Sequence, residues 1–149
     1  MAGANYVLDK GFDVLATYNS SAVAGVLAYR CVAINSATGK IDLNATATAF
    51  SIGVVQENVD ATKVALGKAV VDVRILGITK VRVSDTPGTI VLGSRVAPSG
   101  TGANSGGVKL AVTTNAVLGI VVGPVPIGTP AAGDLIDVLL TPGVGAVLS

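Results

Sequence analysis

Residues 68–83 read KAVVDVRILGITKVRV, and this stretch decides the fold class of the 149-residue chain. On both sides of Gly77, apolar or small side chains alternate with charged ones. An alternation with period two is typical of β-strands that bury one face. The apolar face is formed by Ala69, Val71 and Val73 before the glycine and by Thr79, Val81 and Val83 after it.

We expect these two alternating segments to form a β-hairpin. A three-residue loop at 75–77, with Gly77 in the left-handed region, sets Asp72 opposite Lys80 and Val71 opposite Val81. A two-residue loop would instead mix the polar and apolar faces. The longer loop is therefore the better interpretation.

Four charged side chains along this stretch fall on its polar side: Asp72, Arg74, Lys80 and Arg82. They predict an exposed charged strip, for which two interpretations stay open. The strip contacts a partner protein, or it only keeps the outer face of the hairpin solvated.

The composition extends the β assignment to the whole chain. Half of the residues are hydrophobic but only 3% are aromatic, so Val, Ala, Ile and Leu carry the apolar mass. β-Branched side chains pack well on a pleated surface, and 19 Gly and 6 Pro interrupt any helical periodicity. With 13% charged residues and a mean hydropathy of +0.70, part of the surface is expected to meet another protein.

The chain also matches itself when it is shifted by 66 residues, which predicts an internal duplication. We place the pseudo-repeats at about 25–77 and 90–143. Each half supplies about four short strands, too few to bury both faces alone, so the halves are expected to pair into a small barrel or sandwich. Three glycine pairs superimpose: Gly53 with Gly119, Gly67 with Gly133, and Gly77 with Gly143.

These observations predict one β domain over residues 11–149, preceded by an N-terminal arm over residues 1–10. The arm lies outside both repeats and carries a single apolar patch at 6–8. Residues 98–107 are rich in Gly and Ser and are expected to form a solvent-facing hairpin tip. Residues 37–40 are expected to form another hairpin turn.

Few kinds of chemistry are open to this sequence. It contains no histidine, which excludes Ser-His-Asp, Cys-His and His-zinc sites. The single cysteine, Cys31, lies in an apolar run and is interpreted as a buried hydrophobic residue; alone it cannot build a zinc or iron–sulfur site. We therefore predict no catalytic, cofactor-binding or metal site, and no cofactor. A hydrolase using only carboxylates stays open as a minor alternative.

Charge and hydropathy also limit the partners. The formal net charge is +1, with Lys and Arg spread along the chain, so no nucleic acid is expected as a partner. The longest uncharged stretch, residues 110–133, contains three prolines and alternates like strands, so no membrane partner is expected. The first ten residues lack the features of a signal peptide, which indicates synthesis in a cytoplasm.

The order of glycine-punctuated strands resembles the small capsid cement, or head decoration, proteins of tailed phages. The likeness runs from residue 11 to about residue 143. It is carried by Gly11-Phe12-Asp13-Val14-Leu15, by Ile52-Gly53-Val54-Val55 and its counterpart Leu118-Gly119-Ile120-Val121, by Val71-Asp72-Val73 through Gly77, and by Gly133-Asp134 before the strand at 135–140.

The resemblance implies a small β-barrel or β-tulip-like domain. Together with the duplication and the arm, this predicts an all-β fold built from two pseudo-repeated halves with an extended N-terminal arm. The resemblance also implies a homotrimer bound to the major capsid protein on the outer surface of the virion, after synthesis in the host cytoplasm. We expect Asn5, Tyr6, Val7 and Leu8 to bind the capsid by adding a strand to a sheet edge. The alternative is a phage tail or baseplate β-domain, which could bind carbohydrate.

Overall fold

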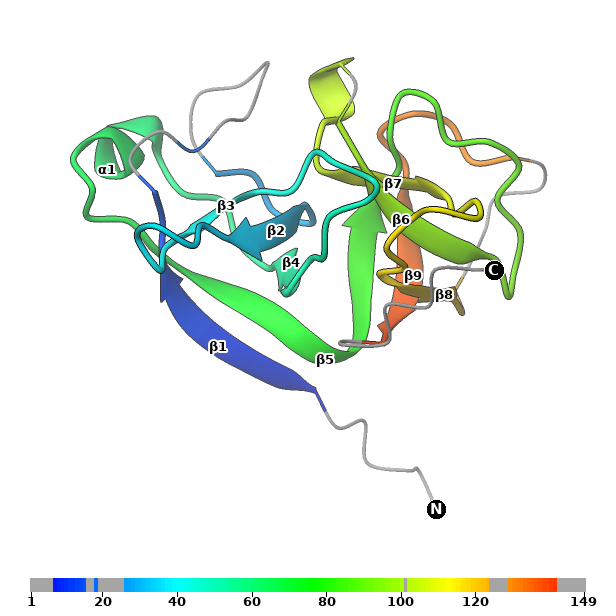
Figure 1. Ribbon diagram of the computed structural model, residues 1–149, viewed down its shortest axis with the longest axis horizontal. Helices are drawn as coiled ribbons and strands as arrows, with labels where there is room; N and C mark the ends of the chain where they lie inside the picture. The colour runs from blue at the N-terminus through cyan, green and yellow to red at the C-terminus, as the bar shows by residue number, and fades with distance from the viewer. Residues whose placement is uncertain (1–6, 16–17, 19–25, 101, 124–128, 142–149) are drawn as a thin grey trace.

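The computed structural model describes residues 7–15, 18, 26–100, 102–123 and 129–141. Nearly all of its regular structure is β, which confirms the predicted fold class (Figure 1). The helical elements are α1 (Ala61–Ala65) and a 3₁₀ turn (Gly102–Asn104). The strands are β1 (Leu8–Asp13), β2 (Cys31–Ile34), β3 (Ile41–Leu43), β4 (Gly53–Val55), β5 (Val70–Arg82), β6 (Arg95–Ser99), β7 (Gly107–Leu110), β8 (Gly119–Val121) and β9 (Leu135–Leu140).

The stretch that was expected to form a hairpin is one strand, β5, of 13 residues. Gly77 has a φ of +99°, in the left-handed region as expected, but it lies inside the strand, which bends as it passes from one half of the molecule to the other (Figure 1). The predicted hairpin is therefore wrong. Its two segments do not pair because other strands lie beside each of them: Asp72 is opposite Gly11, and Lys80 is opposite Asp137.

All the strands form a single antiparallel sheet that curls twice. In the first half the order is β1-β5-β4-β2-β3, and in the second half it is β5-β9-β8-β6-β7. Isolated parallel bridges join Val14, just after β1, to Ile41 of β3, and Val83, just after β5, to Val108 of β7. In each half, the chain next to the strand at one end of the order just given therefore meets the strand at the other end. The two curled halves lie side by side and share β5 (Figure 1).

The internal duplication is present in the strand order, but its boundaries differ from those predicted. The first repeat includes β1, which comes before residue 25, and the second includes the part of β5 after Gly77, which comes before residue 90. Gly67 and Gly133 both have positive φ, +67° and +87°, shortly before the last strand of each repeat. The predicted match of Gly77 with Gly143 involves a residue outside the described ranges.

Gly53 and Gly119 are equivalent because each lies against the last strand of its own half. A Cβ at Gly53 would lie 2.1 Å from the carbonyl oxygen of Arg74, and one at Gly119 would lie 2.2 Å from that of Leu139. A side chain cannot fit at such distances. The glycine match in the sequence therefore reflects the same close backbone approach in both halves.

Each half has its own apolar core, built mainly from β-branched residues as the composition indicates. The first-half core contains Val14, Tyr18, Val26, Val32, Ile41, Val55, Val64, Ala69, Val71 and Val73. The second-half core contains Val81, Val83, Ile90, Val96, Val108, Leu118, Val121, Ile136, Val138 and Leu140, together with Cys31 and Val54 from the first half. The outer face of β2 and β4 therefore packs on the second half.

The two predicted hairpin turns are found. β2 and β3 pair across residues 35–40, and β6 and β7 pair across residues 100–106. The second turn is not wholly solvent-facing as expected, because Ser105 and Gly106 are buried against the first half. There the Arg30 guanidinium donates hydrogen bonds to the carbonyl oxygens of Ser105 and Ala103.

The predicted N-terminal arm is shorter than expected. Leu8 to Lys10 belong to β1 and pair with the first part of β5, so the boundary at residue 10 is wrong. The first part of β5 pairs with β4 along one edge, so its other edge is available to pair with β1. Residues 1–6, including Asn5 and Tyr6, lie outside the described ranges.

Candidate interaction surfaces

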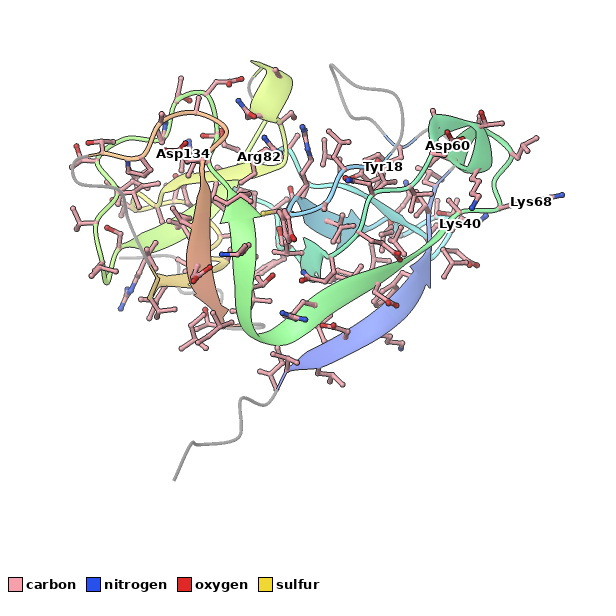
Figure 2. The ribbon with its side chains drawn as sticks, turned by 180° about the vertical axis from the view of Figure 1, so that it is seen from behind. Tyr18, Lys40, Asp60, Lys68, Arg82 and Asp134 are labelled. Atoms are coloured by element: carbon pink, nitrogen blue, oxygen red, sulfur yellow. The ribbon has the colours of Figure 1, made fainter. Side chains whose placement is uncertain are left out.

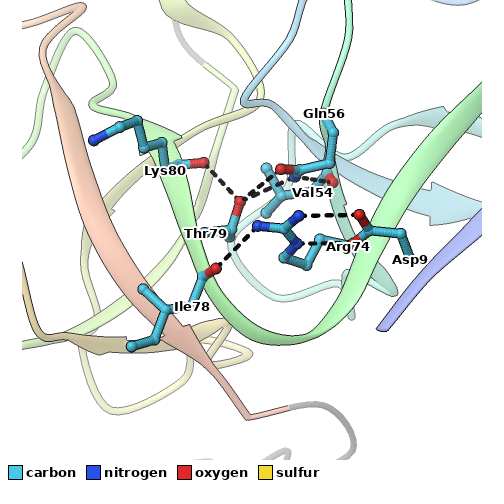
Figure 3. Close-up of polar contacts among 7 residues, drawn as sticks. All are labelled: Asp9, Val54, Gln56, Arg74, Ile78, Thr79 and Lys80. Carbon is cyan, nitrogen blue, oxygen red and sulfur yellow. Dashed lines mark hydrogen bonds and ion pairs between the residues drawn. The ribbon is translucent and has the colours of Figure 1, made fainter. Parts of the chain in front are cut away.

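Polar side chains gather where β5 bends (Figure 3). Arg74 donates to both carboxylate oxygens of Asp9, at 2.8 and 3.0 Å, and to the carbonyl oxygen of Ile78, at 3.2 Å. The Gln56 amide donates to the hydroxyl of Thr79 at 2.9 Å. These contacts join β1, the segment after β4 and both parts of β5 around a hollow of about 340 Å³.

The four residues of the predicted charged strip do lie on β5, but they do not form one flat strip. The bend separates Asp72 and Arg74 from Lys80 and Arg82 (Figure 1). Three of them have partners within the chain: Arg74 pairs with Asp9, Lys80 pairs with Asp137 at 3.1 Å, and Arg82 Nη1 is 3.4 Å from the Asn104 side-chain oxygen and the Gly133 carbonyl oxygen. Contact of the strip with a partner protein stays a prediction.

Charged side chains are distributed over both halves (Figure 2). Asp60 and Lys68 lie at the two ends of the segment that contains α1, and Asp60 caps this helix by accepting a hydrogen bond from the backbone of Thr62 at 2.7 Å. Arg82 and Asp134 lie in the second half. This spread agrees with the dispersed charge of the sequence.

We expect the Asp9–Arg74 pair to contribute a small, pH-dependent stabilisation. The hydrogen bond from Arg74 lowers the pKa of Asp9 below its ordinary value. The contribution is complete above the unfolded-state pKa of about 3.9, and it is lost as the pH falls through the lower folded-state pKa. Both side chains are partly exposed, so we expect less than about 1 kcal/mol.

Urea unfolding of the wild type and of Asp9→Ala measures this effect. The two stabilities should differ at about pH 7 and converge at about pH 2. Asp13→Ala is a matched control, because Asp13 is an exposed carboxylate at the other end of β1. A difference between Asp9→Ala and wild type that does not change with pH would contradict the assignment.

A second hollow, which we call the apolar groove, opens at the first half and has a volume of about 610 Å³. Phe50 is 60% exposed and Leu8 is 51% exposed, so large apolar side chains face solvent here. The Lys10 ammonium lies 5.5 Å from the centre of the Phe12 ring. The groove is lined by Leu8, Lys10, Phe12, Ile34, Phe50, Ser51, Ile52, Ile75 and Leu76.

The groove coincides with part of the predicted capsid-binding segment. Leu8 lines it, and Val7, which precedes Leu8, is 46% exposed. Sequence reasoning missed Ile34 and Phe50, which reach the groove from the end of β2 and from the segment before β4. The one available signal was that Phe50 is one of only two phenylalanines in the chain.

The described residues hold no cluster of three or more side chains suited to bind a metal ion. Cys31 is buried, as the sequence indicates, and burial raises the pKa of its thiol to about 12. At neutral pH this thiol is protonated and therefore a poor nucleophile. Within the described ranges, no helix is both long and apolar enough to cross a membrane.

Fold and surfaces together define a nearly all-β domain of two repeated halves, with polar contacts at its centre and an apolar groove at one side. Its fold is similar to the crystal structure of the head fiber gp8.5 N base in bacteriophage phi29, with a TM-score of 0.56 and 15% sequence identity. The match covers 91% of this chain and 95% of the phage chain. No protein-family model and no curated protein matches the sequence.

Proposed function

We propose that this protein is a structural component of a tailed-phage head, a decoration or cement protein bound to the outside of the capsid. The observation that carries the proposal is the similarity to the head fiber base, which extends over nearly the whole of both chains. The resemblance of the strand order to head decoration proteins supports the same role. The proposed partners are the major capsid protein and further copies of this chain, as a homotrimer.

The role we propose is mechanical and not enzymatic. The described residues place no set of metal-ligating side chains together, and the one thiol is buried. The exposed features are apolar side chains and partly paired charges, which suit binding to another protein surface. Several weak contacts from one oligomer would add through multivalency and so stabilise the shell.

The N-terminal segment proposed to bind the capsid is shorter than the one proposed from the sequence. Leu8 belongs to β1, so the part of the chain proposed to add a strand to a capsid subunit is residues 1–7. Co-sedimentation with heads that lack the protein tests this contact. Deletion of residues 1–7 should reduce binding strongly, whereas Leu66→Asp, a change at an exposed residue beyond α1, should not.

Immunogold labelling of virions from the phage that encodes the chain tests the proposed role itself. Label is expected on the outer surface of the head. Label on the tail or baseplate would instead support the alternative of a tail β-domain. Virions without any label would overturn the assignment to the particle.

A further inference from the structure

Strand pairing sets the two halves in register with each other. β4 corresponds to β8, because Gly53 and Gly119 take the same place in the two halves, 66 residues apart. Val55 of β4 lies opposite Val73 of β5, and Val121 of β8 lies opposite Val138 of β9. The first part of β5 therefore corresponds to β9, with equivalent residues 65 apart. Four positions around the opening of each half follow as equivalents: Lys10 and Thr79, Phe50 and Ala116, Ile52 and Leu118, and Ile75 and Leu140.

In the second half these four positions are covered. Thr79, Ala116, Leu118 and Leu140 are between 2% and 5% exposed. The cover is the first half of the same chain, whose β2 and β4 place Cys31 and Val54 in the second-half core. At two of these positions a hydrogen bond joins the halves: Ala116 N donates to the Ala47 carbonyl oxygen at 2.7 Å, and the Gln56 amide donates to the Thr79 hydroxyl at 2.9 Å.

In the first half the same four positions border the apolar groove, which Lys10, Phe50, Ile52 and Ile75 all line. Lys10 and Phe50 are exposed, and Ile52 and Ile75 are half-buried against the first-half core. Phe50 is 60% exposed, whereas its equivalent Ala116 is 5% exposed. Ile34, which corresponds to the buried Pro98, is 49% exposed. The groove is therefore the first-half copy of a surface that the chain covers in its second half.

The face of the first half that covers the second half also has an equivalent in the second half, and this equivalent is exposed. Val54, Gln56 and Arg74, which face the second half, correspond to Ile120, Val122 and Leu139. Val122 is 43% exposed and Leu139 is 39% exposed, and Ile78, opposite Leu139 on β5, is 44% exposed. Together Ile78, Ile120, Val122 and Leu139 form what we call the outer face of the second half. The exposed Arg95, which pairs with Ile120, stands at the position of Cys31, so this face also includes a charged side chain.

We propose that the apolar groove binds the outer face of the second half of another copy of this chain. The apolar groove and the outer face of the second half are the equivalents of the two surfaces that already pack against each other between the halves of one molecule. Such a contact is head-to-tail, and it closes into a ring or grows into a filament. A ring of three would be the homotrimer of the proposed function, but the head-to-tail contact rests on the repeat and not on attachment to a phage head.

Sedimentation velocity of the purified full chain tests the proposal. The wild type should self-associate, and Phe50→Asp and Val122→Asp should each weaken association about 10- to 100-fold, as loss of a buried apolar side chain implies. Leu66→Asp is the matched control, because Leu66 is 64% exposed and lines neither surface. Circular dichroism should show the same fold for all variants. A monomeric wild type, or equal loss in the control, would overturn the proposal.

Disulfide trapping tests the direction of the contact. The Gln56–Thr79 contact predicts that residue 122 of one copy meets residue 10 of the next, and both sites are exposed. A mixture of Lys10→Cys and Val122→Cys proteins should therefore cross-link on oxidation far more than either protein alone. Dominant cross-linking within either single variant would mean a symmetric contact and overturn the proposal. Virions labelled on the head together with a failed cross-link would refute this contact while leaving the proposed function intact.

Discussion

Gly53→Ala is expected to destabilise the protein by about 3 kcal/mol, a large share of the stability of a small domain. The added methyl group would lie 2.1 Å from the carbonyl oxygen of Arg74 and 2.9 Å from a methyl of Val73. The closest of these atoms belongs to the backbone, so relief requires moving β4 away from β5. That movement would disturb the ladder between these strands and the first-half core beneath them.

Denaturant unfolding followed by circular dichroism measures this loss. Gly11→Ala is the matched control, since its added methyl would meet only side-chain atoms, at 3.7 and 3.9 Å, in ordinary contact. Gly119→Ala should behave like Gly53→Ala, because it meets the Leu139 carbonyl oxygen in the same way. Equal stability of Gly53→Ala and Gly11→Ala would refute the close approach of the strands.

The second large effect is expected for Arg30→Ala, which should cost about 2–3 kcal/mol through lost hydrogen bonds from a charged donor. Arg30 is 2% exposed, and its guanidinium binds the carbonyl oxygens of Ser105 and Ala103. Burial, and next the neighbouring charge of Arg82, lower the pKa of Arg30. Truncation relieves that burial cost but leaves the turn at 100–106 without its main side-chain donor from the first half.

Thermal unfolding of Arg30→Ala beside Lys68→Ala isolates the contribution. Lys68 is an exposed basic residue after α1 that lines neither the apolar groove nor the outer face of the second half, so its truncation should change the stability by no more than about 0.5 kcal/mol. Hydrogen exchange should show faster exchange at the amide of Cys31, which donates to the Gly106 carbonyl oxygen at 2.7 Å. An unchanged melting curve for Arg30→Ala would mean that the hydrogen bonds from Arg30 to this turn do not stabilise the contact between the halves.

The error at β5 shows which signal was missed. Apart from the half-buried Ile75, every odd position from Val71 to Val81 is buried, with no change of phase at Gly77. A hairpin needs turn residues, and Ile75 and Leu76 are poor ones. The glycine permits a bend because it can adopt positive φ, but a bend does not end a strand. Counting the phase across the glycine would have predicted a single strand.

The duplication was predictable because glycines that touch a neighbouring backbone recur at fixed spacing. Gly53 and Gly119 tolerate no side chain, so they leave a visible pattern in the sequence. The apolar groove was only partly predictable. Leu8 stood out as part of an apolar patch, but Ile34 and Phe50 join it through contacts between segments far apart in the chain. Local periodicity contains no information about such contacts.

The sharing of β5 has a consequence for how the protein folds. Its residues Val71 and Val73 belong to the first-half core, and Val81 belongs to the second-half core. Formation of the whole strand therefore requires both cores to form. A second-half fragment that starts after Gly77 would keep the β5 residues that pair with β9, but it would lose Cys31 and Val54, which the first half contributes to its core. The two halves therefore form one cooperative unit and should melt in a single transition, although the chain looks like a tandem array.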